Sequence, residues 1–254
     1  SLIGKIGSQT MFDIQRQDSK WGKDVAEAFS RGDAELGVRI LRANKKLEFY
    51  TSKSESVNGL FYHWQESKEA VKDRLIVAIR NEDVDLLNAR ARVCLKQQKI
   101  LTGSEITLKT GDKKLGYMQG DHIVFKTTNL ALDVSNGDFA TLKSVSKNSF
   151  KLQLDTGKEI EFNPNDSINI GHGYASTVYK AQGASIKEVH VLHTGFSTMR
   201  NSYVSLSRHV KDLRLYTNIK DTPTISSLSR QLKLNPERGS SLDYHTAKEL
   251  EELK

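Results

Sequence analysis

The hydrophobic and polar positions in the first part of the chain recur with the period of helices. Trp21, Val25 and Phe29 occur at every fourth position, which places them on one face of a helix. Residues 10–46 as a whole read as helical with a glycine turn between two helices, and residues 55–71 repeat the pattern. This part of the sequence therefore predicts helices, with only a short LEFY strand between them.

The clearest unit follows in DRLIVAIRNEDVDLLNARARVCLKQQ. The run Leu75–Ile79 is apolar at every position, which is typical of a strand covered on both faces. After a polar turn, four residues recur at helical spacing: Val84, Leu87, Ala91 and Cys94. A strand, a short turn and a helix form half of a βαβ unit, so the sequence predicts the α/β class with a parallel sheet.

Between residues 101 and 165 the pattern changes to the alternation of short strands. Five runs show it: HIVFK, LALDV, DFATLKSV, SFKLQL and KEIEF. Asn136-Gly137 and Thr156-Gly157 supply residues that adopt positive φ in tight turns. These strands predict a small β-barrel. Because α/β patterns flank it on both sides, we expect an insertion into one domain.

After Pro164 the α/β pattern returns. SINI, EVHVL and LRLYT are predicted strands, and STVYKAQG and MRNSYVSLSRH are predicted helices. From Asp221 the chain is polar and rich in serine, so we expect a loosely attached tail that ends in a charged helix. The predicted α/β domain has two parts, residues 1–100 and 166–220. The predicted insertion between them covers residues 101–165, and the tail covers residues 221–254.

Composition and charge narrow the function classes only slightly. The 254 residues are 37% hydrophobic, enough to bury a core, and no window approaches the roughly 18 apolar residues of a membrane span. Lys and Arg number 38 against 31 Asp and Glu, and this charge of +7 suits a nucleic-acid partner or a merely soluble basic protein. The single cysteine, Cys94, fits a reducing cytoplasm and is expected to be a buried structural thiol. Because the chain starts without methionine, we expect a piece of a longer protein.

The polar segment STVYKAQG is the first candidate for ligand binding. A helix capped there by Ser176 or Thr177 would offer unpaired N–H groups to a phosphate. Lys180 adds a positive charge, Tyr179 can stack on a base, and Gly183 lets the backbone approach a ligand closely. An ordinary capped helix with a solvated polar face explains the same residues.

Two arginines are further candidates. Arg208 lies near the end of the helix predicted in NSYVSLSRH, where it either clamps phosphate oxygens or merely complements the helix dipole. Arg16 is flanked by Gln15 and Gln17, whose amides can bind a nucleobase or a phosphate. No metal site is predicted, because the sequence lacks a Cys pair, an HExxH motif and a carboxylate cluster.

Taken in order, several segments resemble the C-terminal, second RecA-like half of superfamily 1 DNA helicases of the RecD-like group. They are DIQRQ, LIVAIRNEDVDLLN, GDHIVFKTTN, HGYASTVYKAQGAS and YVSLSRH, and such helicases typically carry TVHKSQG followed by YVALTR. The tail LSRQLKLNPERGSSLDY further resembles the helicase region of Ti-type conjugative relaxases, the TraA-like proteins. The resemblance spans roughly residues 10–245. It implies a RecA-like parallel sheet with helices on both faces and an SH3-like barrel as the insertion.

The resemblance also implies roles for individual residues. Arg16 and Arg208 would reach the γ-phosphate of ATP as catalytic arginines, because such groups stabilise charge on a transferring phosphoryl group. Three residues would lie near the nucleotide: Gln17, Gln182 and Gly183. Three others would contact the backbone of single-stranded DNA: Thr177, Tyr179 and Lys180. Two positions depart from the family pattern, since Tyr179 replaces its usual His and Ser185 replaces a frequent Glu.

The sequence contains no G-x-x-x-x-G-K-[ST] loop. ATP and Mg²⁺ are therefore expected only in a complete helicase, with an N-terminal half that carries this loop, and we expect the chain alone not to hydrolyse ATP. The favoured interpretation is the motor half of a helicase of plasmid conjugation, acting on single-stranded DNA without a membrane partner. Two alternatives stay open: a non-catalytic fragment that binds single-stranded nucleic acid, and half of a RecD-like repair helicase unrelated to conjugation.

Overall fold

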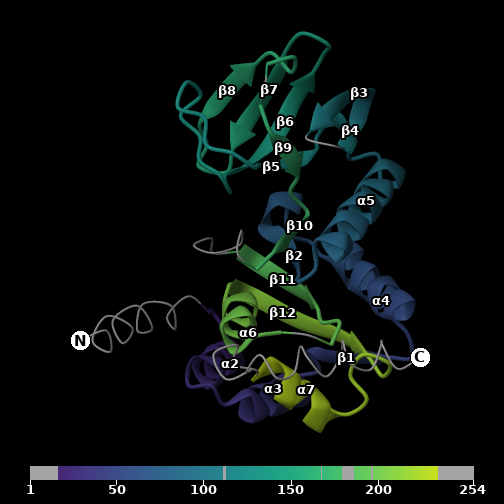
Figure 1. The fold of residues 1–254 in the computed structure, drawn as a ribbon, viewed down its shortest axis with the longest axis vertical. Coiled ribbons are helices and arrows are strands. Elements are labelled where there is room, and N and C mark those ends of the chain that lie inside the picture. The colour runs from purple at the N-terminus through teal and green to yellow at the C-terminus, as the bar shows by residue number, and fades with distance from the viewer. Residues whose placement is uncertain (1–16, 111–112, 167, 179–185, 196, 234–254) are drawn as a thin grey trace, which may run out of the picture.

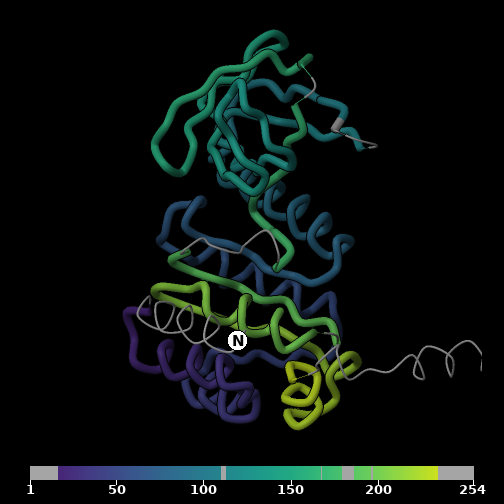
Figure 2. The backbone as a smooth tube through the Cα atoms, turned by 60° about the vertical axis from the view of Figure 1, so that its left-hand side comes forward, coloured from purple at the N-terminus to yellow at the C-terminus, as the bar shows by residue number. Residues whose placement is uncertain are grey.

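The computed structural model describes residues 17–110, 113–166, 168–178, 186–195 and 197–233. A parallel sheet with helices on both faces forms one part of the molecule, and an antiparallel insertion forms the other (Figure 1). Figure 2 shows the insertion as a separate lobe at one end of the long axis. No helix within these ranges is both long and apolar enough to cross a membrane.

The parallel sheet has the strand order β1-β12-β11-β2-β10, and all neighbouring strands run parallel. Its strands are β1 Leu47–Tyr50, β2 Arg74–Ala78, β10 Ala175–Thr177, β11 Ile186–Leu192 and β12 His209–Asn218. Every residue of β2 is buried, which confirms the prediction of a strand covered on both faces. The predicted α/β class with a parallel sheet is therefore confirmed.

Two groups of helices cover the two faces of this sheet (Figure 1). The first group contains α2 Lys20–Ser30, α3 Ala34–Ala43, α6 Met199–Leu206 and α7 Ile225–Leu232, and the second contains α4 Lys53–Glu66 and α5 Asn81–Gln97. Strand β2 shows the division, because Leu75 and Val77 pack in the first core whereas Ile76 and Ala78 pack in the second. The period of two along a strand thus supplies both cores from one short apolar run.

The insertion consists of a hairpin and a five-stranded antiparallel sheet. The hairpin pairs β3 Thr102–Thr110 with β4 Lys113–Gln119. The sheet has the order β8-β7-β6-β5-β9, formed by β5 His122–Phe125, β6 Phe139–Val145, β7 Phe150–Leu154, β8 Glu159–Phe162 and β9 Ile170–His172. Because β9 pairs with β5, the antiparallel sheet continues past residue 165.

The insertion corrects one predicted strand and adds a hairpin that the sequence pattern did not reveal. The segment LALDV is a turn closed by an isolated bridge between Asn129 and Val134. Gly137 and Gly157 adopt φ of 100° and 96°, so the predicted need for positive φ is confirmed at both turns. The hairpin β3–β4 escaped prediction because charged residues interrupt its apolar alternation.

Two predictions about the last third of the chain are wrong. Ser176 and Thr177 do not begin the predicted helix, because Ala175–Thr177 forms strand β10 and pairs with β2. The rest of STVYKAQG, from residue 179 on, lies outside the described residues. The region after Asp221 is not loose throughout. Helix α7 lies within it and buries Leu228 and Leu232 against the core. The predicted terminal helix TAKELEELK lies outside the described residues.

Candidate nucleic-acid interface and nucleotide-facing edge

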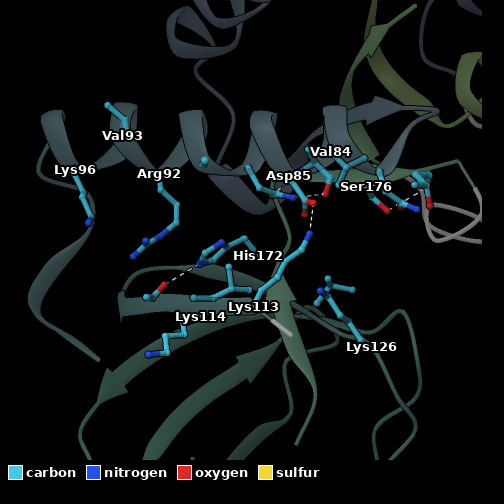
Figure 3. A pocket seen from close by; sticks show the side chains of 18 residues that line it. Val84, Asp85, Arg92, Val93, Lys96, Lys113, Lys114, Lys126, His172 and Ser176 are labelled. Carbon is cyan, nitrogen blue, oxygen red and sulfur yellow. Dashed lines mark hydrogen bonds and ion pairs between the residues drawn. The ribbon is translucent and has the colours of Figure 1, made fainter. Parts of the chain in front are cut away.

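A groove of about 540 Å³ lies between α5 and the β3–β4 hairpin (Figure 3). The end of β9, strand β10 and part of β5 complete its walls. Among the described residues that line it, five are basic and one, Asp85, is acidic. The basic residues are Arg92, Lys96, Lys113, Lys114 and Lys126. A groove with this charge is suited to a polyanion.

The floor of the groove is fixed by Asn88 of α5. Its side-chain oxygen accepts hydrogen bonds from the backbone N–H groups of Tyr174 and Ala175, at 3.0 and 2.9 Å. Its side-chain nitrogen donates to the carbonyl of Ala175 at 3.0 Å. One buried amide therefore holds the chain where it leaves the insertion and enters β10. This contact positions Thr177, which is half-buried and lines the groove at the carboxyl end of β10.

A buried ion pair ties α5 to the insertion beneath the groove. Arg92 donates from Nε and Nη2 to the two carboxylate oxygens of Asp121, at 2.9 and 3.0 Å. Tyr174 donates its hydroxyl to the same carboxylate at 2.6 Å, and the N–H of Met118 donates at 2.7 Å. Burial, together with the neighbouring Asp121 charge, raises the pKa of Tyr174 well above its usual value. The carboxylate is thus fully satisfied, and the insertion is held to α5 at a fixed point.

Glycines allow two side chains to reach the groove region. A Cβ on Gly171 would lie 2.4 Å from Cε of Lys126, so a larger residue there would displace this lysine. A Cβ on Gly116 would lie 2.0 Å from Oε1 of Glu105. This carboxylate contacts Arg92 through Oε1 at 2.8 Å and Lys96 through Oε2 at 2.9 Å. Glycine at these two positions therefore leaves room for the side chains of Lys126 and Glu105 to pass directly over the backbone.

Two lining residues differ in what they contribute at neutral pH. Burial lowers the pKa of His172, whose Nε2 lies 2.9 Å from the carbonyl of Gly116, so this histidine is neutral. Burial lowers the pKa of Arg92, but hydrogen bonds and charges from Asp121 and Glu105 outweigh it and the net pKa is raised. The positive charge of the groove therefore comes from Arg92 and the lysines.

The opposite end of the parallel sheet carries Gln17 and Arg208, two of the predicted site residues. Gln17 is buried, and its Nε2 donates to the carbonyls of Ser207 and His209, at 2.9 and 3.1 Å. The N–H of Asp18 donates to the carbonyl of Val210 at 2.9 Å. The residue that follows Arg16 in sequence is thus bonded to the chain on both sides of Arg208.

Arg208 itself lies at the amino end of β12, directly after α6 and its C-cap Ser207. Its carbonyl accepts a hydrogen bond from the N–H of Ile186 at 3.1 Å. The residue is only 5% exposed, so it is embedded in this edge of the sheet. Next to it, burial lowers the pKa of His209 to about 4, and the ring stacks on Trp21 with centroids 5.7 Å apart.

The predicted site residues thus fall into two groups on opposite ends of the sheet. Thr177 lies at the groove, and Gln17 and Arg208 lie at the other edge. The amide nitrogen of Gln17 is committed to backbone carbonyls. The remaining predicted residues lie outside the part of the chain that the structure describes: Arg16, Tyr179, Lys180, Gln182 and Gly183.

Sequence reasoning missed the groove lysines. The signal was the pair Lys113-Lys114 directly after a Thr-Gly-Asp turn sequence, followed by Lys126 at the end of an apolar strand. Only the pairing of the hairpin and the packing of α5 bring them together. Cys94 is buried, as predicted. Within the described ranges, no group of three or more His, Cys, Asp or Glu side chains is placed to hold a metal ion.

Comparison with curated proteins finds similarity over nearly the whole chain. The conjugal transfer protein TraA of Agrobacterium fabrum is 28% identical over 251 residues, which is 98% of this chain and 23% of that protein. The probable conjugal transfer protein TraA of Sinorhizobium fredii is 28% identical over 250 residues, again covering 23% of its length. The chain therefore spans about a quarter of these relatives. No family model matches it.

Solved structures show the same fold in helicases. Bacteroides Pif1 bound to single-stranded DNA superposes with a TM-score of 0.57 at 14% identity, over 93% of this chain and 55% of that one. Bacteroides Pif1 helicase in complex with ADP-AlF3 and single-stranded DNA gives a TM-score of 0.50, over 78% and 49%. The resemblance predicted from the motifs is thus confirmed: TraA proteins match in sequence, and Pif1 helicases share the fold.

Proposed function

We propose that this chain is the C-terminal motor half of an ATP-dependent DNA helicase or translocase that acts in plasmid conjugative transfer. Its similarity to TraA proteins over nearly its whole length supports the biological role. Its fold supports the helicase assignment. The observation that carries the proposal is the basic groove at the carboxyl ends of β2 and β10, where Thr177 lies.

The groove is the proposed binding site for single-stranded DNA. Phosphates of the strand contact the groove lysines, and Thr177 donates its hydroxyl to a phosphate oxygen. The apolar lining residues offer a surface to the bases: Val84, Ala89, Val93, Leu115 and Val124. Tyr179 and Lys180 extend these contacts along the segment that follows β10. The insertion, proposed to be SH3-like, closes over the strand.

The opposite edge is the proposed half of an ATP site. Arg16 and Arg208 face the γ-phosphate, and Gln182 and Gly183 lie against the nucleotide. The residues of this chain fit only that side of the site, because Arg208 lies at the edge but no phosphate-binding loop occurs in the 254 residues. When ATP and Mg²⁺ are held by an N-terminal half, the arginines stabilise charge on the transferring phosphoryl group. Gln17 is better placed to position the chain around Arg208 than to contact the nucleotide.

Binding of a labelled oligothymidylate, measured by fluorescence anisotropy over a range of salt concentrations, tests the groove. Counterion release makes log affinity fall with log salt by about 0.7 per phosphate neutralised on a single strand. The triple variant Lys113→Gln, Lys114→Gln, Lys126→Gln should therefore reduce the slope by about 2 and weaken binding. The control is Lys143→Gln, Lys147→Gln, Lys151→Gln, which removes the same charge outside the groove. Equal losses in the two variants would contradict the groove as the binding site.

Non-catalytic binding of single-stranded nucleic acid is the second candidate. It is favoured by the missing phosphate loop together with a groove that lies entirely within this chain. Mixing the chain with the N-terminal region of a TraA relative separates the two. The motor proposal predicts DNA-stimulated ATP hydrolysis that Arg208→Ala abolishes, whereas the second candidate predicts no change in hydrolysis.

A further inference from the structure

An exposed ion pair spans the groove between its two walls. Lys113 at the start of β4 reaches across to the carboxylate of Asp85 on α5 (Figure 3). The two side chains are 56% and 52% exposed, and both residues line the groove. The lysine that stands opposite α5 is therefore held by a carboxylate of the same chain.

A second carboxylate acts in a similar way near the other end of α5. Glu105 of β3 contacts Lys96 at 2.9 Å and Arg92 at 2.8 Å. The hydrogen bonds from Lys96 and then Arg92 lower the pKa of Glu105, so it is ionised at neutral pH. Unlike Asp85, it belongs partly to the support of the buried Arg92 and does not itself line the groove. Asp85 is thus the carboxylate that a strand in the groove would meet.

The chemistry of the pair makes it exchangeable. A carboxylate and a phosphate offer a lysine ammonium group the same kind of charged oxygen acceptor. An exposed Lys–Asp pair contributes little to stability, so opening it for another anion costs little. Once opened, Asp85 remains as a negative charge on the wall of the site and repels the incoming backbone.

We propose that Asp85 is an intramolecular competitor of the nucleic-acid strand: it occupies Lys113 when the groove is empty, and a backbone phosphate replaces it when a strand enters. This inference rests on the proposed function of the groove. The exchange lowers affinity for short or weakly charged strands and lets a bound strand be released, because the lysine has an alternative partner. Asp85 is therefore a residue that sets affinity by opposing binding.

The test compares Asp85→Asn with Asp133→Asn. Asp133 forms an exposed ion pair with Lys158 at 2.7 Å, and neither residue lines the groove. Both variants remove one negative charge from an exposed Lys–Asp pair, so they change the net charge equally. We expect Asp85→Asn to tighten oligothymidylate binding about two- to fivefold at low salt, and Asp133→Asn to change it much less. In a Lys113→Gln background the gain from Asp85→Asn should shrink, because the competing pair no longer exists.

The outcomes separate this inference from the proposed function. If Asp85→Asn gains no more affinity than Asp133→Asn while the triple lysine variant still loses affinity, the competitor role is wrong and the groove remains the binding site. If the triple lysine variant also binds like its control, the proposed function of the groove fails as well. Circular dichroism of each variant confirms that the comparison is made between folded proteins.

Discussion

The two ends of the parallel sheet differ in whether their polar side chains are buried or exposed. At the amino end of β12, Gln17 is bonded to backbone carbonyls, and Arg208 and His209 are buried. At the carboxyl ends of β2 and β10, by contrast, Lys113 and its partner Asp85 are more than half exposed. One end is closed by contacts within the chain, and the other is open and positively charged.

This difference gives the two ligands of the proposed function different requirements. Buried polar groups that are bonded to backbone cannot change partner without a large cost. Exposed ion pairs exchange partners readily. The open end is thus suited to receive a polyanion by itself, whereas the closed end, under the function proposed above, supplies Arg208 to a nucleotide site that an N-terminal half completes.

The largest effect is expected at the floor of the groove. Asp121→Asn removes the buried charge partner of Arg92 and leaves it only the more exposed Glu105, so it should lower the free energy of unfolding by about 3 kcal/mol or somewhat more. Chemical denaturation measures the loss. Asp85→Asn is the matched control on the exposed pair of the same groove and should cost less than about 1 kcal/mol. Similar losses of stability in the two variants would show that the buried Arg92–Asp121 pair and the exposed Lys113–Asp85 pair do not differ in their contribution to folding.

A pH-dependent effect is expected at the closed end. The pKa of His209 is about 4 in the folded chain because burial disfavours its charged form, compared with about 6.5 in an unfolded chain. Between these values the unfolded chain binds more protons than the folded chain. The contribution of His209 to stability is therefore fully present above pH 6.5 and is lost as pH falls from 6.5 through 4. The contribution is roughly 3 kcal/mol.

Replacing this histidine isolates that contribution. In His209→Gln the slope of unfolding free energy against pH between 4 and 6.5 should become shallower than in the unmodified chain. His63→Gln is the control, since burial also lowers the pKa of His63 but the side chain is only half-buried. An unchanged slope in His209→Gln would mean that the closed end is hydrated and can be protonated.

A smaller effect is expected for the side-chain amide of Gln17, which bonds the backbone on both sides of Arg208. Gln17→Ala removes both hydrogen bonds to the carbonyls of Ser207 and His209 and should lower stability by about 1–3 kcal/mol. Oligothymidylate affinity should stay unchanged, because Gln17 lies at the other end of the sheet from the groove. A loss of DNA affinity with little loss of stability would reverse the roles assigned to the two ends.

Local sequence patterns predicted two kinds of element: strands that are buried on both faces, and helices whose apolar residues recur at a regular spacing. The run Leu75–Ile79 identified β2 because a strand between two helical layers is apolar at every position. Ser176 and Thr177 misled the prediction, since they are typical of a helix N-cap, yet pairing with β2 makes them part of a strand. Tertiary pairing decided a segment whose local preferences were ambiguous.

The candidate site was predictable only where its residues lie in recognisable motifs. Thr177 and Arg208 became candidates in this way, but the groove did not. Its position depends on contacts between distant residues, such as Asn88 with Ala175 and Arg92 with Asp121. No periodicity in the sequence reports contacts of this kind, so the lysines at positions 113, 114 and 126 read only as part of a general positive charge.

One experiment tests the central claim most directly: titration of the chain with oligothymidylate, with and without ATP and Mg²⁺, while phosphate release is recorded. The account predicts salt-sensitive DNA binding that ATP does not alter, and no phosphate release, because the groove lies within the chain whereas the nucleotide edge lacks a phosphate-binding loop. DNA-stimulated phosphate release that Arg208→Ala abolishes would contradict it, as would an absence of DNA binding at low salt.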